Sequence, residues 1–483
     1  MTEYTGIIES KDGFQIPVKN NISFHSKYNV LKESESFANQ FNQNDLFFII
    51  GGLCGGYHIQ KLLEVNKNRI IIVIENSEED IKFLTKIEQI KNLFDSKNVI
   101  ITHPKALLKT ILDNYLPAIY GKIQISFLRS WETTFSQNAQ LCKTIINKAI
   151  ESISADFSVQ SQFGLIWHKN IFNNLKYAEK LDISNIEPLF DTNKTAAIIA
   201  AGPSLDESAQ IIQQNREKYF VICTDTAYST FNKLNIFVDV VVSIDGQCIS
   251  KDHFFEIKNK NTLFLFDLCG NASAVKKVIK NRNPIIFFES GHPLSVVASI
   301  YNGKKNFIHI ETGKGTVTIA ATDFAKKMGF KDIEFFGADF SYLNGKPYAK
   351  GTYLDNLYAI KSSRITNTET AFTKLLYRTE LISIEKNKYT TKILESYKES
   401  LDLYLKQKIT EINLKRINKY NNKDFINFLK NNLNSLQEKD FLKKENLILF
   451  TLLPLIAFYE KTYDRIKSFK LALSNTLRYT DII

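Results

Sequence analysis

The sequence has little cysteine for its length, and that cysteine is widely spaced. It includes no Cys-x-x-Cys pair, and no paired histidines lie nearby. Structural zinc sites and disulfide frameworks need thiols that are grouped or regularly spaced. The pattern therefore argues against both. The five cysteines are Cys54, Cys142, Cys223, Cys248 and Cys269.

Long apolar runs and a leader-like start are also missing. The best candidate for a membrane span, Leu447–Tyr459, is shorter than the roughly 20 residues that a span needs, and it contains Pro454. The first residues, Met1–Gly6, carry charge and have no apolar core, so no secretory signal is expected. We therefore expect a cytoplasmic protein without a membrane span.

Basic residues are in excess, but they are not concentrated. The formal net charge is +11, yet the lysines are scattered, and no dense Lys/Arg run is interleaved with aromatic residues. Such a run is the usual electrostatic footprint of nucleic-acid binding. We therefore expect no nucleic-acid partner, although the charge is compatible with phosphorylated small molecules.

The length of 483 residues, with 44% hydrophobic and 23% charged residues, suits a folded protein of several domains. Short β-rich runs alternate with helix-length segments in the first and middle parts, which predicts βαβ units and parallel sheets. Predicted strands lie at 46–50, 70–74, 98–102 and 123–127, and then near 195–200, 219–223, 238–244, 262–266, 284–288, 307–310 and 332–336.

Glycine and proline nearly vanish beyond about Ile360, where leucine, isoleucine, lysine and glutamate recur at helical spacing. We therefore predict an α/β fold with three domains. Residues 1–150 form a Rossmann-like N-terminal domain. Residues 151–358 form a central, doubly wound, mainly parallel sheet domain with entry helices at 151–190. Residues 359–483 form a helical C-terminal domain.

A glycine-rich turn, Gly51–His58, ends the first predicted strand, and Glu75 ends the second. This arrangement is typical of a Rossmann site, in which the carboxylate accepts hydrogen bonds from ribose hydroxyls. One interpretation is a site for a nucleotide or S-adenosylmethionine. The other, which we favour, is a Rossmann-like scaffold, because isolated glycine-rich turns are weak signals.

The most informative segment is Thr195–Asp206, an apolar run that ends at Ala-Gly-Pro-Ser before a helical pattern. Pro203 suits the first helical positions and Ser204 can cap them, so that backbone N–H groups are directed at an anion. A plain strand-to-helix connection is the alternative. Further polar or glycine-rich segments follow later apolar runs, at the sheet edge where open α/β sheets bind ligands.

Taken together, these segments resemble the domain shared by the motility-associated factors (Maf) that glycosylate flagellin and the archaeal 6-hydroxymethylpterin diphosphokinases. The N-terminal glycine-rich turn and Phe163–Leu175 are similar to the Maf flanking regions, so the resemblance covers most of residues 45–355. The matching central blocks are Ala201–Asp206, Thr224–Ala227, Asp239–Asp245, Gly313–Val317 and Gly337–Gly345, followed by Ala349–Gly351.

A more distant resemblance is to bacterial sialyltransferases that use CMP-sialic acid without a metal. It implies that Tyr342 and Tyr348, which follow a Gly-x-Asp-Phe block, donate to the departing phosphate. Two features depart from that pattern. An asparagine of their turn is Ala201 here, and no histidine follows His309, so the general base is left unassigned.

Chemistry and resemblance together suggest roles for the remaining residues. Backbone N–H groups of Gly202, Ser204 and Leu205 are expected to bind a nucleotide phosphate. Asp225 is expected to bind a ribose or base donor, with a helix cap as the alternative. Asp245 is the candidate base or sugar-hydroxyl acceptor, with a turn-forming Asp-Gly as the alternative.

The later blocks supply further candidates. Gly313, Gly315 and Thr316 open a helix and are expected to form a second anion seat. Asp339 is a candidate orienting carboxylate, which must be hydrogen-bonded if it is buried. His292 is a candidate catalytic group, although a lone loop histidine is more often structural.

The resemblance implies a glycosyltransferase that moves a CMP-activated nonulosonic acid, of pseudaminic or legionaminic type, onto Ser/Thr hydroxyls of flagellin. No cofactor or metal is expected, because Asp245-Gly-Gln lacks the second carboxylate of a DxD motif. Three alternatives stay open. They are diphosphate transfer to a hydroxymethylpterin with ATP and Mg²⁺, a methyltransferase on the N-terminal turn, and a non-catalytic flagellin-binding factor.

Overall fold

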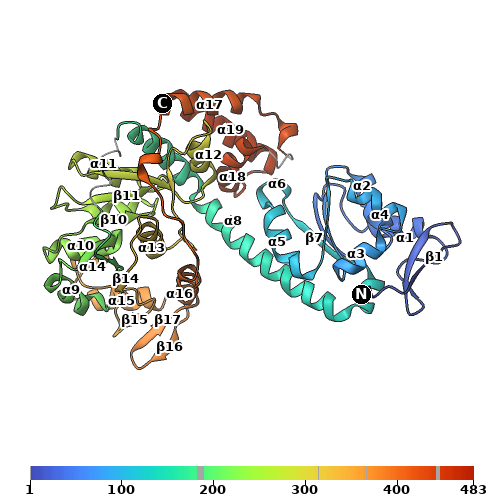
Figure 1. Cartoon of the computed structure of the whole chain (residues 1–483), viewed down its shortest axis with the longest axis horizontal. Helices are drawn as coiled ribbons and strands as arrows, with labels where there is room; N and C mark the ends of the chain where they lie inside the picture. The colour runs from blue at the N-terminus through green and yellow to red at the C-terminus, as the bar shows by residue number, and fades with distance from the viewer. Residues whose placement is uncertain are drawn as a thin grey trace. The chain divides into compact units, whose positions relative to one another are not determined.

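The structure is a computed structural model that describes residues 2–181, 186, 190–313, 315–365, 367–441 and 446–482 (Figure 1). The chain divides into two compact units. The first unit comprises Met1–Gly164, Leu436–Leu449 and Leu453–Leu473. The second unit comprises Leu165–Ser435, Phe450–Leu452 and Ser474–Ile483. The predicted C-terminal domain, 359–483, is shared between the two, and the three-domain division stays a prediction.

The first unit is built on a four-stranded sheet of order β6-β5-β4-β7, in which every neighbouring pair is parallel. Its strands coincide with the four predicted runs, because isoleucine, valine and phenylalanine suit strands buried on both faces. The strands are β4 (Phe47–Gly51), β5 (Ile70–Ile74), β6 (Val99–Thr102) and β7 (Ile123–Phe127).

A small antiparallel sheet of β1 (Gly6–Glu9), β2 (Gln15–Lys19) and β3 (Ile22–Ser23) precedes this parallel sheet. The helices of this part are α1 (Val30–Ala38), α2 (Tyr57–Val65), α3 (Glu78–Leu84), α4 (Glu88–Phe94), α5 (Pro104–Asn114), α6 (Pro117–Tyr120) and α7 (Arg129–Thr134). The alternation of strands and helices confirms the Rossmann-like α/β prediction for this part of the chain.

The second unit is built on a seven-stranded parallel sheet of order β13-β12-β11-β10-β9-β8-β14. Six strands follow one another in chain order, and β14 then lies on the other side of β8. The topological switch point is therefore between β8 and β14. The strands are β8 (Thr195–Ile199), β9 (Tyr219–Thr224), β10 (Val240–Ser243), β11 (Leu263–Asp267), β12 (Ile285–Glu289), β13 (Ile308–His309) and β14 (Ile333–Phe336).

Helices cover both faces of this sheet, as a doubly wound fold requires. On one face, α13 (Val317–Lys327) packs across β8, β9 and β10. Its small residues Ala320 and Ala321 let it approach the strands closely, and Phe324 completes the buried cluster. On the other face, Tyr228 of α10 (Asp225–Lys233) packs edge-on against Phe264 of β11. Further helices are α9 (Leu205–Gln214), α11 (Ala272–Lys280) and α12 (Pro293–Ile300).

The long helix α8 (Ser136–Ala178) includes most of the predicted entry helices at 151–190 but begins earlier, and it contributes residues to both units. Within the predicted entry segment, residues 182–185 and 187–189 lie outside the described residues. Later helices are α14 (Tyr353–Lys361), α15 (Thr368–Leu376), α16 (Lys392–Leu405), α17 (Asn422–Ser435), α18 (Leu447–Tyr459) and α19 (Arg465–Ile482).

The C-terminal part is not wholly helical, which corrects the prediction. A three-stranded antiparallel sheet forms from β15 (Tyr342–Leu343), β17 (Lys388–Thr390) and β16 (Ile382–Glu385). The turn between β16 and β17 contains Asn387 at φ 65°, a left-handed conformation that asparagine tolerates. Strands this short leave too weak an alternation in the sequence to be recognised.

The apolar segment Leu447–Tyr459 forms α18, whose side chains are largely buried. Within the described ranges, no helix combines the length and apolar character that crossing a membrane demands. The apolar side chains of this segment pack inside the protein.

Candidate functional site

The glycine-rich turn of the first unit is closed by the protein's own side chains. Glu75 is fully buried and accepts hydrogen bonds from the backbone N–H of Leu53 at 3.1 Å and from the indole N–H of Trp131 at 2.7 Å. Burial raises the pKa of Glu75 to about 7. A Cβ added to Gly52 would lie 2.9 Å from Trp131. The carboxylate is already bound internally, which supports the scaffold interpretation over a ribose site.

At the switch point of the second unit, the Gly-Pro-Ser turn packs against the loop after β14. The backbone N–H of Ser204 donates to the Asp339 carboxylate at 2.9 Å, and the N–H of Gly202 donates to the carbonyl of Gly337 at 2.8 Å. The N–H of Leu205 donates to the carbonyl of Gly202 at 3.0 Å. In this arrangement, all three groups predicted to bind phosphate have internal acceptors.

This packing also explains the glycines. A Cβ on Gly202 would lie 2.3 Å from Asp339 Oδ2, and a Cβ on Gly337 would lie 2.3 Å from the carbonyl oxygen of Ala200. Contacts this short do not exist between real atoms, so the two loops fit together only with glycine at these positions. Asp339 therefore orients the turn through this hydrogen bond, but it is half-buried rather than buried, and its role in ligand binding stays a prediction.

The predicted second anion seat lies at the start of α13. Thr316 caps the helix by accepting a hydrogen bond from the N–H of Ile319 at 3.2 Å. Gly313 and Gly315 have φ values of 55° and 85°, and their N–H groups donate to the Glu311 side chain and the Thr312 carbonyl. These donors are also used within the loop. Lys314 lies outside the described residues.

Two aspartates lie at the carboxyl ends of β9 and β10, as predicted. Asp225 is 2% exposed and is the first residue of α10 rather than its cap. Its Oδ2 accepts from the Ser243 hydroxyl at 2.7 Å. Asp245 accepts from the Gln247 N–H at 2.9 Å through Oδ1. Burial raises the pKa of Asp245, and the negative charge of Asp225 adds to the increase, whereas His253 opposes it.

His253 was missed by sequence reasoning, because it lies in the 3-10 helix Cys248–Phe254 and not at a strand end. It is 4% exposed, and its ring packs edge-on against Tyr353 with centroids 4.3 Å apart. Its buried Nδ1 has no hydrogen-bond partner among the residues that the structure describes. The imidazole of His253 also lies close enough to Asp245 to lower the pKa of that carboxyl.

A group of phenols extends the same region. Burial raises the pKa of Tyr353 to about 12, and Tyr348 and Asp245 contribute to the increase. Burial also raises the pKa values of Tyr342 and Tyr348, whereas the nearby Arg378 lowers both. All three phenols therefore stay protonated at neutral pH and are able to donate hydrogen bonds. Arg378 and Tyr353 carry no strand-end signal, so the sequence did not reveal them.

Hydrogen bonds tie the tyrosine segment to the predicted loops. The N–H of Ala349 donates to the carbonyl of Ala201 at 2.9 Å, and the N–H of Lys350 donates to the Asp206 carboxylate at 2.7 Å. Further along, the Thr230 hydroxyl of α10 donates to the carbonyl of Lys350 at 2.9 Å. The structure therefore joins the Tyr348 loop to the Gly-Pro-Ser turn, and the residues that follow this loop to the second half of α10.

A second set of contacts fixes the loop after Asp245. The Asn170 side chain, on α8, donates to the carbonyl oxygens of Gly246 and Cys269, each at 3.0 Å. A Cβ on Gly246 would lie 2.7 Å from that Cys269 oxygen. Cys248, two residues further on, is exposed, whereas the other four cysteines are buried.

His292 does not fit the predicted catalytic role. Its Nδ1 accepts a hydrogen bond from the N–H of Leu294 at 3.2 Å, so the side chain caps α12. Burial lowers the pKa of His292 to about 3, and Trp167 packs edge-on at a centroid distance of 6.0 Å. An imidazole whose lone pair is engaged and whose basicity is this low makes a poor proton acceptor. We therefore correct this assignment to a structural one.

Metal binding has no obvious location in the described part of the chain, where no group of three or more His, Cys, Asp or Glu side chains is arranged to hold an ion. The site as built consists of two carboxylates, one imidazole, three phenols and an arginine. Such a set can accept a proton, bind hydroxyl groups and donate hydrogen bonds to an anion.

Comparisons with known proteins agree with this architecture. Residues 169–345 match the family model described as 6-hydroxymethylpterin diphosphokinase MptE-like. A solved structure, the Maf glycosyltransferase from Magnetospirillum magneticum AMB-1, superposes with a TM-score of 0.55 at 12% identity. The match covers 99% of this chain and 86% of that one. At this identity, the similarity establishes the fold.

Two relatives come from Treponema pallidum (strain Nichols), and each is described as an uncharacterized protein. One is 33% identical over 150 residues, which cover 31% of this chain and 70% of the relative. The other is 35% identical over 173 residues, which cover 34% of this chain and 59% of the relative. The first match is extensive enough to establish common family membership.

The pair of His309 and Glu289 predicts a pH-dependent contribution to stability. Nδ1 of His309 lies 2.9 Å from Glu289, and this hydrogen bond, with help from Glu311, raises the pKa of His309 to about 9 from an ordinary 6.5. A raised histidine pKa stabilises the fold fully below the ordinary value, and the contribution disappears as the pH rises through the folded value. His309→Gln should therefore lower the urea midpoint at about pH 6 and change it little at about pH 10. Equal losses at both pH values would show that the ion pair is not responsible.

Proposed function

This chain belongs to the same family as the Treponema pallidum relative, with a Maf-like fold and an MptE-like domain, and from that premise we propose that it is a glycosyltransferase. The donor is a CMP-activated nonulosonic acid of pseudaminic or legionaminic type, and the acceptors are Ser/Thr hydroxyls of flagellin. The reaction uses no metal or other cofactor. The known activity of the structural neighbour supports the reaction class, and the resemblance of the sequence motifs supports the choice of donor and acceptor.

The observation that carries this proposal is the packing of the Tyr353 ring against His253, with centroids 4.3 Å apart, in the segment whose Ala349 N–H is hydrogen-bonded to Ala201 of the Gly-Pro-Ser turn. Electrostatic effects agree with this arrangement: Tyr348 and Asp245 raise the pKa of Tyr353, and Tyr342 raises that of Tyr348. Ligands of open α/β sheets bind at the carboxyl edge of the sheet, next to the switch point. Protonated phenols stabilise a phosphate as negative charge develops on it, which is the work that a divalent cation does in other transferases.

The proposed reaction proceeds by direct displacement. The acceptor hydroxyl oxygen bonds to the anomeric carbon of the sugar, while the bond between that carbon and the CMP phosphate oxygen breaks and its electron pair stays on the phosphate. Asp245 accepts the hydroxyl proton, since a raised pKa brings its basicity closer to neutral. Tyr342 and Tyr348 donate hydrogen bonds to the departing phosphate. His253, rather than His292, is the imidazole close to Asp245 in the proposed site.

Calorimetric titration of the full chain tests the choice of nucleotide. We expect CMP to bind equally well with and without Mg²⁺, because the phenols and Arg378 supply the donors for the phosphate. The MptE-like match favours one alternative, diphosphate transfer to a hydroxymethylpterin. Binding of ATP only with Mg²⁺, and no binding of CMP, would establish that alternative. No binding of any nucleotide would favour a non-catalytic flagellin-binding factor.

Asp245→Asn tests the proton acceptor. The substitution keeps the size of the side chain but removes its basicity, so turnover should fall by about 10²- to 10⁴-fold while CMP affinity and the urea midpoint change little. Asp252→Asn, which alters a carboxylate in the adjacent 3-10 helix, is the matched control and should stay active. An active Asp245→Asn enzyme would reduce this residue to a turn former.

The double variant Tyr342→Phe, Tyr348→Phe tests stabilisation of the leaving group. Loss of donors to charge that develops in the transition state lowers the turnover number by about 10²-fold or more, with a much smaller effect on CMP affinity. Tyr377→Phe is the control, because that side chain is 71% exposed. Turnover and CMP binding are measured on the same preparations. A loss of CMP affinity with unchanged turnover would show that the phenols bind the nucleotide but do not stabilise the transition state.

A further inference from the structure

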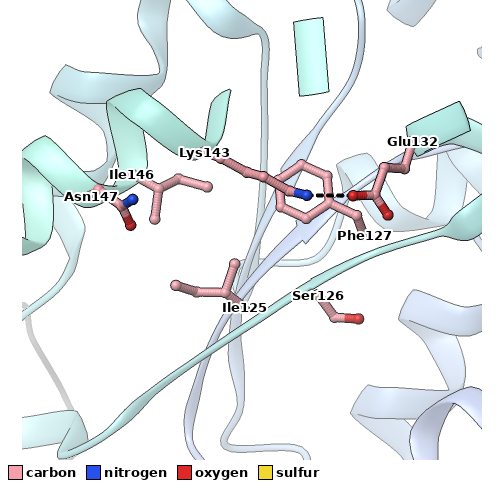
Figure 2. Close-up of a pocket in the computed structure, with 7 residues that line it drawn as sticks. All are labelled: Ile125, Ser126, Phe127, Glu132, Lys143, Ile146 and Asn147. Carbon is pink, nitrogen blue, oxygen red and sulfur yellow. Dashed lines mark hydrogen bonds and ion pairs between the residues drawn. The ribbon is translucent and has the colours of Figure 1, made fainter. Parts of the chain in front are cut away.

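A cavity of about 470 Å³ lies between strand β7 and helix α8 of the first unit (Figure 2). Ile125, Ser126 and Phe127 of β7 form one side of it. The other side chains come from α7 and α8. They are Glu132, Lys143, Ile146 and Asn147. The volume falls within the range of about 300–1,000 Å³ that is typical of ligand-binding pockets.

Strand β7 is an edge strand whose outer side is unpaired in the described part of the chain. It pairs with β4 alone, in parallel register. The backbone N–H of Leu128 donates to the carbonyl of Gly51 at 2.8 Å. Since alternate residues of a parallel strand face the same neighbour, Ser126 also faces β4, and the N–H and C=O groups of Ile125 and Phe127 face away from it.

Within the strand itself, no residue protects this edge from pairing, although Lys143 of α8 lies over Phe127. Natural edge strands are usually blunted by lysine, proline, a bulge or an inward charge. The strand Ile-Gln-Ile-Ser-Phe has none of these, its register with β4 is regular, and Ile125 is 40% exposed. An unprotected edge beside a cavity has the features of a surface that accepts a further strand.

The walls of the cavity restrict what can occupy it. Lys143 forms an ion pair with Glu132 and lies over the Phe127 ring at 5.4 Å from its centroid (Figure 2). Ile125 and Ile146 provide apolar contacts, and Asn147 provides an amide.

We propose that the outer edge of β7 binds an extended segment of the protein acceptor as an added strand, with an apolar side chain placed against Ile125 and Ile146. This inference rests on the proposed function only in assigning the segment to the acceptor. It gives the first unit a role that its closed glycine-rich turn does not supply: it recruits the acceptor polypeptide by main-chain pairing, separately from the chemistry at the other sheet.

Two measurements on the full chain separate docking from chemistry. Binding is measured by titration with unglycosylated flagellin, and chemistry is measured as CMP release from the CMP-activated sugar to water, without acceptor. Asn147→Trp fills the cavity from an exposed helix position, and Ile125→Pro removes an outward N–H. Each should raise the flagellin Kd by about tenfold or more and leave CMP release unchanged. The controls, Glu151→Trp one turn further along α8 and Ile125→Val, should bind as the original protein does.

Amide hydrogen exchange distinguishes strand pairing from side-chain docking. When flagellin is bound, exchange at Ile125 and Phe127 should slow, whereas it should be unaltered in Asn147→Trp. Unchanged flagellin affinity in both cavity variants, or no protection of these amides, would overturn the proposal. A dimer that dissociates on Asn147→Trp would show that the edge pairs two copies of this chain instead. Absence of CMP release by the original protein would refute the proposed chemistry without affecting the docking result.

Discussion

The hydrogen bond from the Ser204 N–H to the Asp339 carboxylate is the constraint on which the site depends. It joins the turn after β8 to the loop after β14 across the point where the strand order reverses. The mutual fit of Gly202 and Gly337 allows this contact, and the Ala349 to Ala201 hydrogen bond then places the Tyr348 loop beside it. A carboxylate at a helix N-terminus is favourable in itself, so the protein supplies its own anion there.

For ligand binding, the consequence is that side chains, rather than the backbone N–H groups of the turn, are available as donors. Because the N–H groups of the Gly-Pro-Ser turn are engaged, the reaction proposed above assigns recognition of the anionic ligand to the phenols and to Arg378. The carboxylates of Asp225 and Asp245 remain at neighbouring strand ends, where they suit hydroxyl groups and proton transfer. In the proposed site, the hydrogen bond between Ser204 and Asp339 fixes the turn beside these strand ends. The tyrosines and Arg378, which come later in the chain, complete the set of side chains.

Much of this fold could be predicted from the sequence, because parallel strands buried on both faces appear as continuous apolar runs. The same logic predicts Asp225 and Asp245 as polar residues at strand ends, which is where the structure places them. His253, Tyr353 and Arg378 are not predicted in this way, since only tertiary packing brings them close. Asp339 is 135 residues from Ser204, so its hydrogen bond with this one of the three predicted phosphate donors could not be recognised in the local pattern. His292 carried a strand-end signal, but its lone pair caps a helix.

The distribution of thiols has a practical consequence. Burial raises the pKa values of Cys54, Cys142, Cys223 and Cys269, so these thiols react slowly with alkylating reagents at neutral pH. Cys248 is exposed and follows Asp245 by three positions. A maleimide fluorophore would therefore attach selectively to the unaltered polypeptide, next to the residues whose environment a bound sugar nucleotide would change. Ligand binding could therefore be followed by fluorescence at Cys248 without any substitution.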